Sequence, residues 1–225
     1  MPAKNSIKQY LENGYYHIYN RGVEKRTIFL DSQDYAVFLS YLKSYLLPKK
    51  EKKLMEKLSH PTISCRERDK ILRELRLNNF YNDIHLLAYC LMPNHFHFLI
   101  KQAKAESIDR FMNSLCTRYT MYFNRKYKRV GSLYQDVYKA VLVSSEPQLL
   151  HLTRYIHNQA DNNLNQRLPS SYDDYISPSG NGWVCPEEIL SYFSKDYPNL
   201  SYQDFLRQQD EGELAREILI ELETD

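Results

Sequence analysis

Two apolar runs that meet at a Pro-Asn dipeptide indicate a β-hairpin in the middle of the chain. The first run covers residues 83–92, the second covers residues 95–102, and Pro93-Asn94 lies between them. Pro sets φ near a turn value, and Asn tolerates the unusual backbone angles that turns need. A connection this short joins antiparallel strands. We therefore expect a largely antiparallel sheet.

Other segments supply further strands and helices around this hairpin. Residues 15–20 are rich in aromatic side chains and follow Asn13-Gly14, which is typical of a strand, and Asp31 can cap a helix that ends before Pro48. The remaining predicted elements are a helix at 107–127, a strand at 132–143 and a helix at 149–159. This order of strands and helices is typical of an α+β fold.

Residues 49–80 differ in character from the segments around them. Their first part is rich in lysine, Pro61 interrupts them, and the second part has Ile71, Leu72 and Leu75 on one side of a charged stretch. The pattern predicts an inserted helical hairpin that protrudes from the body. A coiled coil or a binding arm is the alternative, and no motif in the segment supports either.

The net charge of +2 hides two regions of opposite sign. Residues 1–160 hold 26 Lys and Arg against 14 Asp and Glu, whereas residues 161–225 hold 4 against 14. A basic body with many of the 20 tyrosines indicates nucleic acid binding, although a solvated basic surface beside an acidic tail is the alternative. We predict one domain over residues 1–176 and an acidic, mostly helical extension over 177–225, with helices at 187–193 and 211–223.

The composition also indicates the cellular compartment. The four cysteines show no C-x-x-C spacing and are too few for a disulfide framework, which favours a reducing compartment. No apolar run reaches the length of about 18 residues that a membrane span needs, and the N-terminus lacks a signal-peptide core. We expect a cytoplasmic protein that binds no membrane.

The run His95-Phe96-His97 is a candidate metal site. Alternate residues of a strand project to the same face, so both imidazoles lie together while Phe96 faces the other way. Neutral imidazole is a good ligand for divalent metal ions. Two histidines on a solvated strand face are the alternative interpretation.

Tyr155 and Gln159 form a second candidate pair. They are four residues apart on a predicted helix, so both project from one helical face. The amide oxygen of Gln159 is a candidate metal ligand, and a tyrosine phenolate is a candidate nucleophile on phosphorus. A half-buried core tyrosine is the alternative for Tyr155. His157 lies between them and is expected to be structural.

The third candidate is a basic and aromatic stretch at residues 118–129. Exposed tyrosines would stack on bases while neighbouring cations neutralise phosphates. The expected phosphate ligands are Arg125, Lys126, Lys128 and Arg129. Lys and Arg also favour helix C-termini for dipole reasons, which is the alternative explanation.

Taken in order, these segments resemble the single-tyrosine HUH transposases, in particular the REP-associated tyrosine transposases. The resemblance covers roughly residues 14–176 without the 49–80 insertion. The matching motifs are Tyr16 to Gly22, Met92 to Ile100 with its Met-Pro-Asn-His-x-His run, Tyr119 to Tyr127, Gly131 to Gln135, and Tyr155 to Gln159.

The resemblance implies a ferredoxin-like HUH fold, an antiparallel sheet with helices packed on one face. It implies a transposase that recognises hairpin DNA and cleaves a single strand. By this mapping His95, His97 and Gln159 bind Mg²⁺ or Mn²⁺, and Tyr155 forms a 5′-phosphotyrosine while a 3′-hydroxyl is freed. The implied DNA-binding residues are Asn20, Arg21, Arg118, Tyr119, Asn124, Arg125, Lys126, Lys128 and Arg129.

Two other functions stay open at this point. One is a hairpin-binding protein on the same fold that does no chemistry, and the other is a metal-dependent hydrolase that uses water while Tyr155 is structural. The oligomeric state is open too. The family includes homodimers that exchange the tyrosine helix and monomers that act in cis.

Overall fold

A computed structural model describes residues 10–161, 167–177 and 182–208. Its centre is a four-stranded antiparallel sheet with the strand order β2-β3-β1-β4. The strands are β1 (Tyr15–Arg21), β2 (Ile84–Met92), β3 (His95–Gln102) and β4 (Lys139–Val143). The predictions of an α+β fold and of the central β2–β3 hairpin are confirmed.

Strand β4 is shorter than the predicted strand at 132–143. The regular pairing of β4 with β1 begins at Lys139, which lies opposite Tyr19, although β1 itself continues to Arg21. Nearer its start, the segment meets the end of β1 again in a shifted register. Gly22 and Tyr134 form an isolated bridge there, and hydrogen bonds run from Val23 N to Leu133 O and from Gln135 N to Arg21 O, both 2.9 Å long. This segment is therefore an extended loop against the end of β1.

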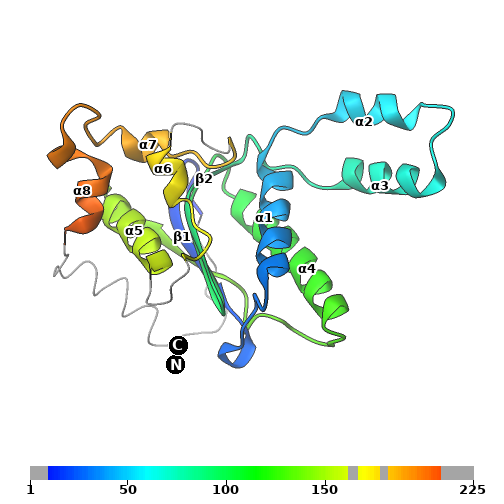
Figure 1. Cartoon of the computed structure of the whole chain (residues 1–225), viewed down its shortest axis with the longest axis horizontal. Helices are drawn as coiled ribbons and strands as arrows, with labels where there is room; N and C mark the ends of the chain where they lie inside the picture. Colours follow the sequence, from blue (N-terminus) through cyan, green and yellow to red (C-terminus); the bar gives the residue numbers. More distant parts are fainter. Residues whose placement is uncertain (1–9, 162–166, 178–181, 209–225) are drawn as a thin grey trace.

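Two long helices cover one face of the sheet (Figure 1). Helix α1 (Ser32–Leu46) begins at the N-cap Asp31, whose carboxylate accepts a hydrogen bond from Asp34 N, and helix α4 (Ser107–Lys126) packs beside it. Phe38 of α1 meets Phe96 of β3 at 5.6 Å between ring centroids. Side chains of both helices and of this sheet face form one buried apolar cluster.

Shorter helices cover the other face. Helix α5 (Glu146–Asn158) contacts β2 and β3, and the second apolar cluster joins it to Leu99 and Cys90 of the sheet. The C-terminal helices α6 (Tyr172–Ile176), α7 (Glu187–Leu190) and α8 (Tyr202–Arg207) add side chains to the same cluster. Both faces therefore carry helices, which extends the prediction of helices on one face. Apolar side chains on both sides of β2 and β3 require this cover.

The C-terminal predictions are met only in part. Helix α7 is shorter than the helix expected at 187–193, because Tyr192 and Phe193 leave it in turn-like hydrogen bonds. The helix expected at 211–223 lies outside the described residues. Short 3-10 turns occur at η1 (Val23–Lys25), η2 (Gln159–Asp161) and η3 (Pro198–Leu200).

The inserted segment forms the predicted helical hairpin. Helices α2 (Glu51–Leu58) and α3 (Cys65–Arg76) lie side by side and project away from α1 and α4 as an arm (Figure 1). Within the described ranges, no helix has the length and apolar character needed to cross a membrane.

Candidate active site

The strand register gathers polar side chains at one end of the sheet. Arg21 of β1 lies opposite His95 of β3, and Tyr19 lies opposite His97. Residues directly opposite each other in an antiparallel pair project to the same face. His17, two residues before Tyr19, shares this face as well. The two predicted histidines therefore stand beside three residues of β1.

Helix α5 carries Tyr155 to the same place. The tyrosine ring lies 5.5 Å from the His97 ring and 6.4 Å from the His17 ring, centroid to centroid, with its edge toward both. Leu152 and Ile156, buried on either side of Tyr155, hold the helix on the sheet. One chain thus supplies both the histidines and the tyrosine.

Gln159 and His157 occupy the end of the same helix. Gln159 is the C-cap of α5 and opens η2, one helical turn after Tyr155. His157 is fully buried, and its ring nitrogens pair with Tyr202 Oη at 2.6 Å and Ser171 Oγ at 2.7 Å. These two contacts join α5 to the C-terminal segments, so the structural role expected of His157 is confirmed.

His97 and His17 form a buried pair. His17 Nε2 lies 3.0 Å from His97 Nδ1, and both rings are almost fully buried. His97 Nε2, the other ring nitrogen, is buried and has no hydrogen-bond partner within the part of the chain that the structure describes. A buried polar atom without a partner is costly unless something binds it. His97 therefore has one nitrogen engaged by His17 and one available for a ligand.

Asn94 engages one ring nitrogen of His95, as His17 does for His97. Asn94 Oδ1 lies 2.6 Å from His95 Nδ1, and Asn94 Nδ2 donates to Lys25 O at 3.3 Å. The second bond orients the amide, so its oxygen faces the imidazole. An amide oxygen only accepts, so Nδ1 of the neutral ring carries the proton and Nε2 keeps its lone pair.

Burial keeps all three imidazoles neutral. It lowers the pKa of His17 to about 3 and, together with the nearby charge of Arg21, the pKa of His95 to about 4. Burial and the neighbouring His17, His95 and Arg21 also hold the pKa of His97 well below its ordinary value. A neutral imidazole has the lone pair that a metal ion needs.

These residues fit a divalent metal ion. Two neutral histidines lie on one face of β3, and the buried Nε2 of His97 has no hydrogen-bond partner among the described residues. Such a pair is a suitable start for a metal site. Among the residues that the structure describes, no three His, Cys, Asp or Glu side chains are grouped to hold a metal. Gln159, which the sequence resemblance implies as the third ligand, lies one helical turn after Tyr155 on α5.

The expected DNA-binding residues are divided between the two faces. Arg21 stands on the histidine face, where its charge acts on His95 and His97. Asn20 projects to the opposite face and is 7% exposed; it donates to Asp136 O at 3.2 Å and accepts from Arg21 N at 2.9 Å. Its amide is therefore engaged in holding the end of β1.

The prediction that Tyr119 contacts DNA is wrong. Tyr119 is fully buried, packs on Phe29 and Phe38, and donates a hydrogen bond to Ile28 O at 2.6 Å. Its position in the periodic apolar face of α4 already favours the core over the surface. The ring cannot stack on a base without unpacking α1 from α4.

The other predicted DNA-binding residues on α4 and in the turn after it differ in exposure. Arg118 stacks on the Tyr41 ring at 3.7 Å, and Lys126 pairs at 2.7 Å with both Asp31 and the buried Asp34. Arg129 donates to Asn124 Oδ1 at 3.1 Å and so stabilises the turn after the helix. The two remaining residues, Arg125 and Lys128, are exposed.

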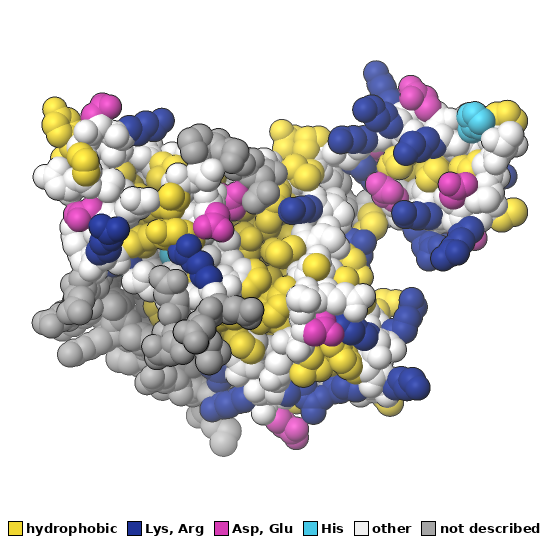
Figure 2. Space-filling view, in the orientation of Figure 1, with side chains coloured by type: hydrophobic (Ala, Val, Ile, Leu, Met, Phe, Trp, Pro, Cys, Tyr) yellow, Lys and Arg dark blue, Asp and Glu magenta, His cyan; other side chains and the backbone are white. Residues whose placement is uncertain are grey.

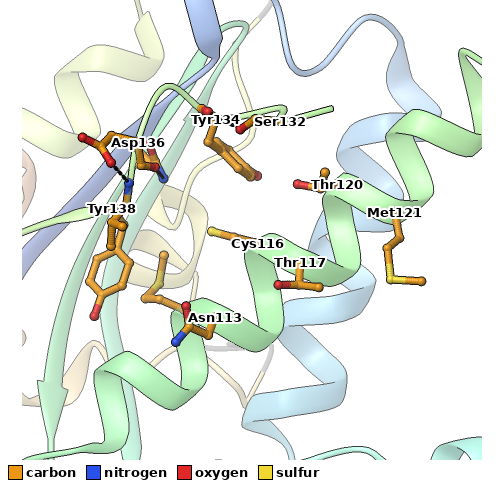
Figure 3. A pocket seen from close by; sticks show the side chains of 12 residues that line it. Asn113, Cys116, Thr117, Thr120, Met121, Ser132, Tyr134, Asp136 and Tyr138 are labelled. Carbon is orange, nitrogen blue, oxygen red and sulfur yellow. Dashed lines mark hydrogen bonds between the residues drawn. The ribbon is translucent and has the colours of Figure 1, made fainter. Parts of the chain in front are cut away.

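A separate cavity lies on the α4 face of the sheet (Figure 3). It has a volume of about 310 Å³, and Asn113, Thr117 and Thr120 of α4 line it together with Tyr134 and Tyr138. The sheet separates it from the histidine pair, because Asn20, which also lines it, projects away from that face.

Three residues near the site were given no role by the sequence. His17 lies within the Tyr16 to Gly22 motif, but only the register shows that it meets His97. Asn94 was noted as a turn residue and as part of the Met-Pro-Asn-His-x-His run, without a role of its own. Lys139 of β4 lies opposite Tyr19 and shares the histidine face, which the longer predicted strand did not single out.

Comparison with known protein families identifies the chain. The profile of a family described as IS200-like transposases matches residues 36–159, more than half of the chain, including both histidines and Tyr155. The chain belongs to the IS200-like transposase family. It is therefore a transposase that acts on DNA, as the sequence resemblance predicts. No curated protein matches it.

The solved structures that the chain matches include two transposases. The REP-associated tyrosine transposase bound to a REP hairpin has 10% identity and a TM-score of 0.48, over 81% of this chain and 88% of that one. A putative transposase from Deinococcus radiodurans has 17% identity and a TM-score of 0.28, over 69% and 97%. The tRNA(His) guanylyltransferase from Saccharomyces cerevisiae has 11% identity and a TM-score of 0.34, over 96% and 80%. These values are low, so the assignment to IS200-like transposases rests on the family profile.

Proposed function

We propose that this transposase cleaves and rejoins single-stranded DNA with Tyr155 as the nucleophile and a divalent metal ion as cofactor. The observation that carries the proposal is the Tyr155 ring against His97, whose buried Nε2 has no hydrogen-bond partner among residues 10–161, 167–177 and 182–208. A core tyrosine has no need of two neutral, oriented histidines beside it.

The reaction is a transfer of a phosphoryl group to tyrosine. Tyr155 Oη attacks the phosphorus of the scissile phosphodiester, the bond from phosphorus to the 3′-oxygen breaks, and the phenolic proton is lost as the 3′-oxygen gains one. The strand then carries a 5′-phosphotyrosine and a free 3′-hydroxyl. Because the covalent bond keeps the phosphodiester energy, a second 3′-hydroxyl can attack it and rejoin strands without ATP.

In this proposal His95, His97 and Gln159 hold Mg²⁺ or Mn²⁺. A bound divalent ion acts as a Lewis acid on the phosphate and orients it for in-line attack. Two imidazoles and one amide suit Mn²⁺ at least as well as Mg²⁺, which prefers oxygen ligands. Arg21, on the same face, adds positive charge where the phosphate would lie.

Asn94 and His17 act as positioning residues in the proposed site. Asn94 holds the proton of His95 on Nδ1 and so directs Nε2 toward the phosphate side. His17 does the same for His97 when it accepts from Nδ1. Partners of this kind orient metal-binding histidines and raise their basicity.

The proposed substrate is a strand that carries a hairpin, as the sequence resemblance implies. Arg125 and Lys128 are exposed and so are suited to contact its phosphates. Arg118, Lys126 and Arg129 have contacts within the chain, and we assign them a secondary part in binding.

A denaturing-gel assay tests the mechanism. Hairpin-bearing strands labelled at the 5′ or 3′ end are incubated with Mg²⁺, Mn²⁺ or EDTA, and Tyr155→Phe serves as the matched control. We expect a metal-dependent protein–DNA band that carries only the 3′-side fragment and is absent from the variant. Free 5′ ends without protein would instead identify a water-using hydrolase. Binding without any adduct, across varied hairpins, would identify a non-catalytic binder.

A further inference from the structure

The arm formed by α2 and α3 contributes little to the body of the protein. Its own buried residues are Leu54 of α2 and Ile71 of α3, which belong to neither apolar cluster of the body. The sheet and its helices thus pack without them. A segment that projects in this way and adds nothing to the core points to a role in binding.

The base of the arm is held firmly. Lys49 Nζ donates to Leu77 O at 2.8 Å, and Asn79 Nδ2 donates to Leu47 O at 2.8 Å and Tyr45 O at 3.2 Å. Phe80, the next residue, is buried in the core. The direction in which the arm projects is therefore set by the body.

Exposed basic side chains form two rows on this arm. Leu54 marks the inner face of α2, and three lysines spaced by three and then four residues lie together on one side of that face. Ile71 marks the inner face of α3, and three more cations spaced by four and then three residues lie together on one side of it. We call these residues the basic flank: Lys50, Lys53, Lys57, Arg66, Lys70 and Arg73. All six are exposed, and Figure 2 shows Lys and Arg side chains gathered on the arm.

Both rows lie on the same side because the helices are antiparallel. The electrostatics agree, since hydrogen bonds from Ser64 and the charges of Lys57 and Lys70 lower the pKa of Glu67 on α3. Glu67 is one of three acids on this side, with Glu56 and Glu74, and it is engaged in a capping box with Ser64. The cations there still outnumber the acids.

The opposite side of the arm is closer to neutral. This side has three cations, Lys52, Arg68 and Arg76, and two acids, Glu51 and Asp69. The positive excess of the arm is thus concentrated on the basic flank. A concentrated row of exposed cations suits a polyanion.

The composition of the arm selects the form of DNA. No Phe, Tyr or Trp occurs between Lys49 and Asn79. The one aromatic ring of the arm, His60, lies in the turn between α2 and α3 and not on the basic flank. Proteins that bind single strands normally combine cations with such rings. Paired DNA needs only backbone contacts, because its bases stack on each other.

The arm leads into the end of β2 that lies away from His95. Residues 77–83 join α3 to Ile84, while Met92 at the other end of β2 lies opposite His95. The basic flank and the histidines are therefore separate surfaces of the chain. We propose that the basic flank binds the backbone of the double-stranded part of the DNA on which the chain acts. The proposal rests on the chain acting on DNA and does not require the tyrosine chemistry.

Charge-neutral variants of the full chain test this surface. The flank variant combines Lys53→Gln, Lys57→Gln and Lys70→Gln, all at exposed positions, so circular dichroism should match the wild type. Binding to a labelled stem-loop DNA is measured by anisotropy in EDTA over a series of salt concentrations. We expect the slope of log K against log salt to fall by about 2.7, from three phosphate contacts at about 0.9 each.

The matched control removes the same charge from the opposite side. It combines Lys52→Gln, Arg68→Gln and Arg76→Gln, and its slope should stay near that of the wild type. Equal slopes in all three proteins, or equal losses in both variants, would overturn the proposal. If the flank variant lost as much of the salt slope on unstructured oligo-dT as on the stem-loop, the flank would bind single strands instead. A wild-type chain that binds through the flank but forms no adduct refutes the tyrosine mechanism alone.

Discussion

Replacement of His17 tests whether the buried pair with His97 prepares a metal site or merely fills space. His17→Leu removes the nitrogen that lies 3.0 Å from His97 Nδ1 and leaves that nitrogen buried without a partner. The His97 ring would then lose the contact that sets its orientation and its proton position. His17→Gln is the matched variant, because its amide can reach the place of Nε2 and offers an oxygen to His97.

The size of the effect follows from the kind of contact. Loss of a partner that orients a metal-binding histidine typically weakens metal affinity by about 10- to 100-fold, which is about 1.4 to 2.7 kcal/mol. The unpaired buried nitrogen also destabilises the fold by about 1 to 3 kcal/mol. We expect His17→Leu to show both losses and His17→Gln to recover most of the metal affinity.

Mn²⁺ titration followed by electron paramagnetic resonance measures the free and bound ion without DNA. Thermal unfolding of the same samples, with and without Mn²⁺, reports the loss of stability separately. A folded His17→Leu protein that binds Mn²⁺ as tightly as the wild type would refute the positioning role. Equal losses of affinity in the Leu and Gln variants would also refute it, because a hydrogen bond would not be the cause.

Three further substitutions separate binding, chemistry and folding. Tyr155→Phe should abolish the covalent adduct on denaturing gels while the Kd for hairpin DNA stays nearly unchanged, because only the attacking oxygen is lost. Tyr119→Phe should lower the free energy of unfolding by about 1 kcal/mol in urea titrations, through loss of the hydrogen bond to Ile28 O, with no effect on DNA affinity. Arg125→Gln should leave stability unchanged and reduce the salt slope of DNA binding by about 0.9; an unchanged slope would show that Arg125 contacts no phosphate.

Most elements could be predicted because local signals agree with the final structure. The Pro93-Asn94 turn, the alternation in β3 and the Asp31 cap each act within a few residues, and each element forms where expected. Strand β4 was predicted too long because its pairing with β1 shifts register before Lys139, which no local pattern records.

In the candidate site too, local patterns predict some residues, while the contacts of others depend on packing. His95, His97 and Tyr155 were found because their spacing on a strand and a helix is a local property, and the fold brings them together. Tyr119 was misassigned because a tyrosine beside basic residues has the same composition whether it faces solvent or the core. The packing of α4 on α1 decides this, since only there does the hydroxyl reach Ile28 O.

Local sequence is enough to predict most of the elements, the helical arm, the charge of that arm and the types of residue available for phosphoryl transfer. These properties depend on side-chain chemistry and on periodicity over short stretches of chain. The tertiary structure decided that His17 engages His97, that Asn94 orients His95, and that Asn20 faces away from both. Such contacts depend on strand register, and the hydrophobic burial that sets the register is a property of the whole sheet and its helices.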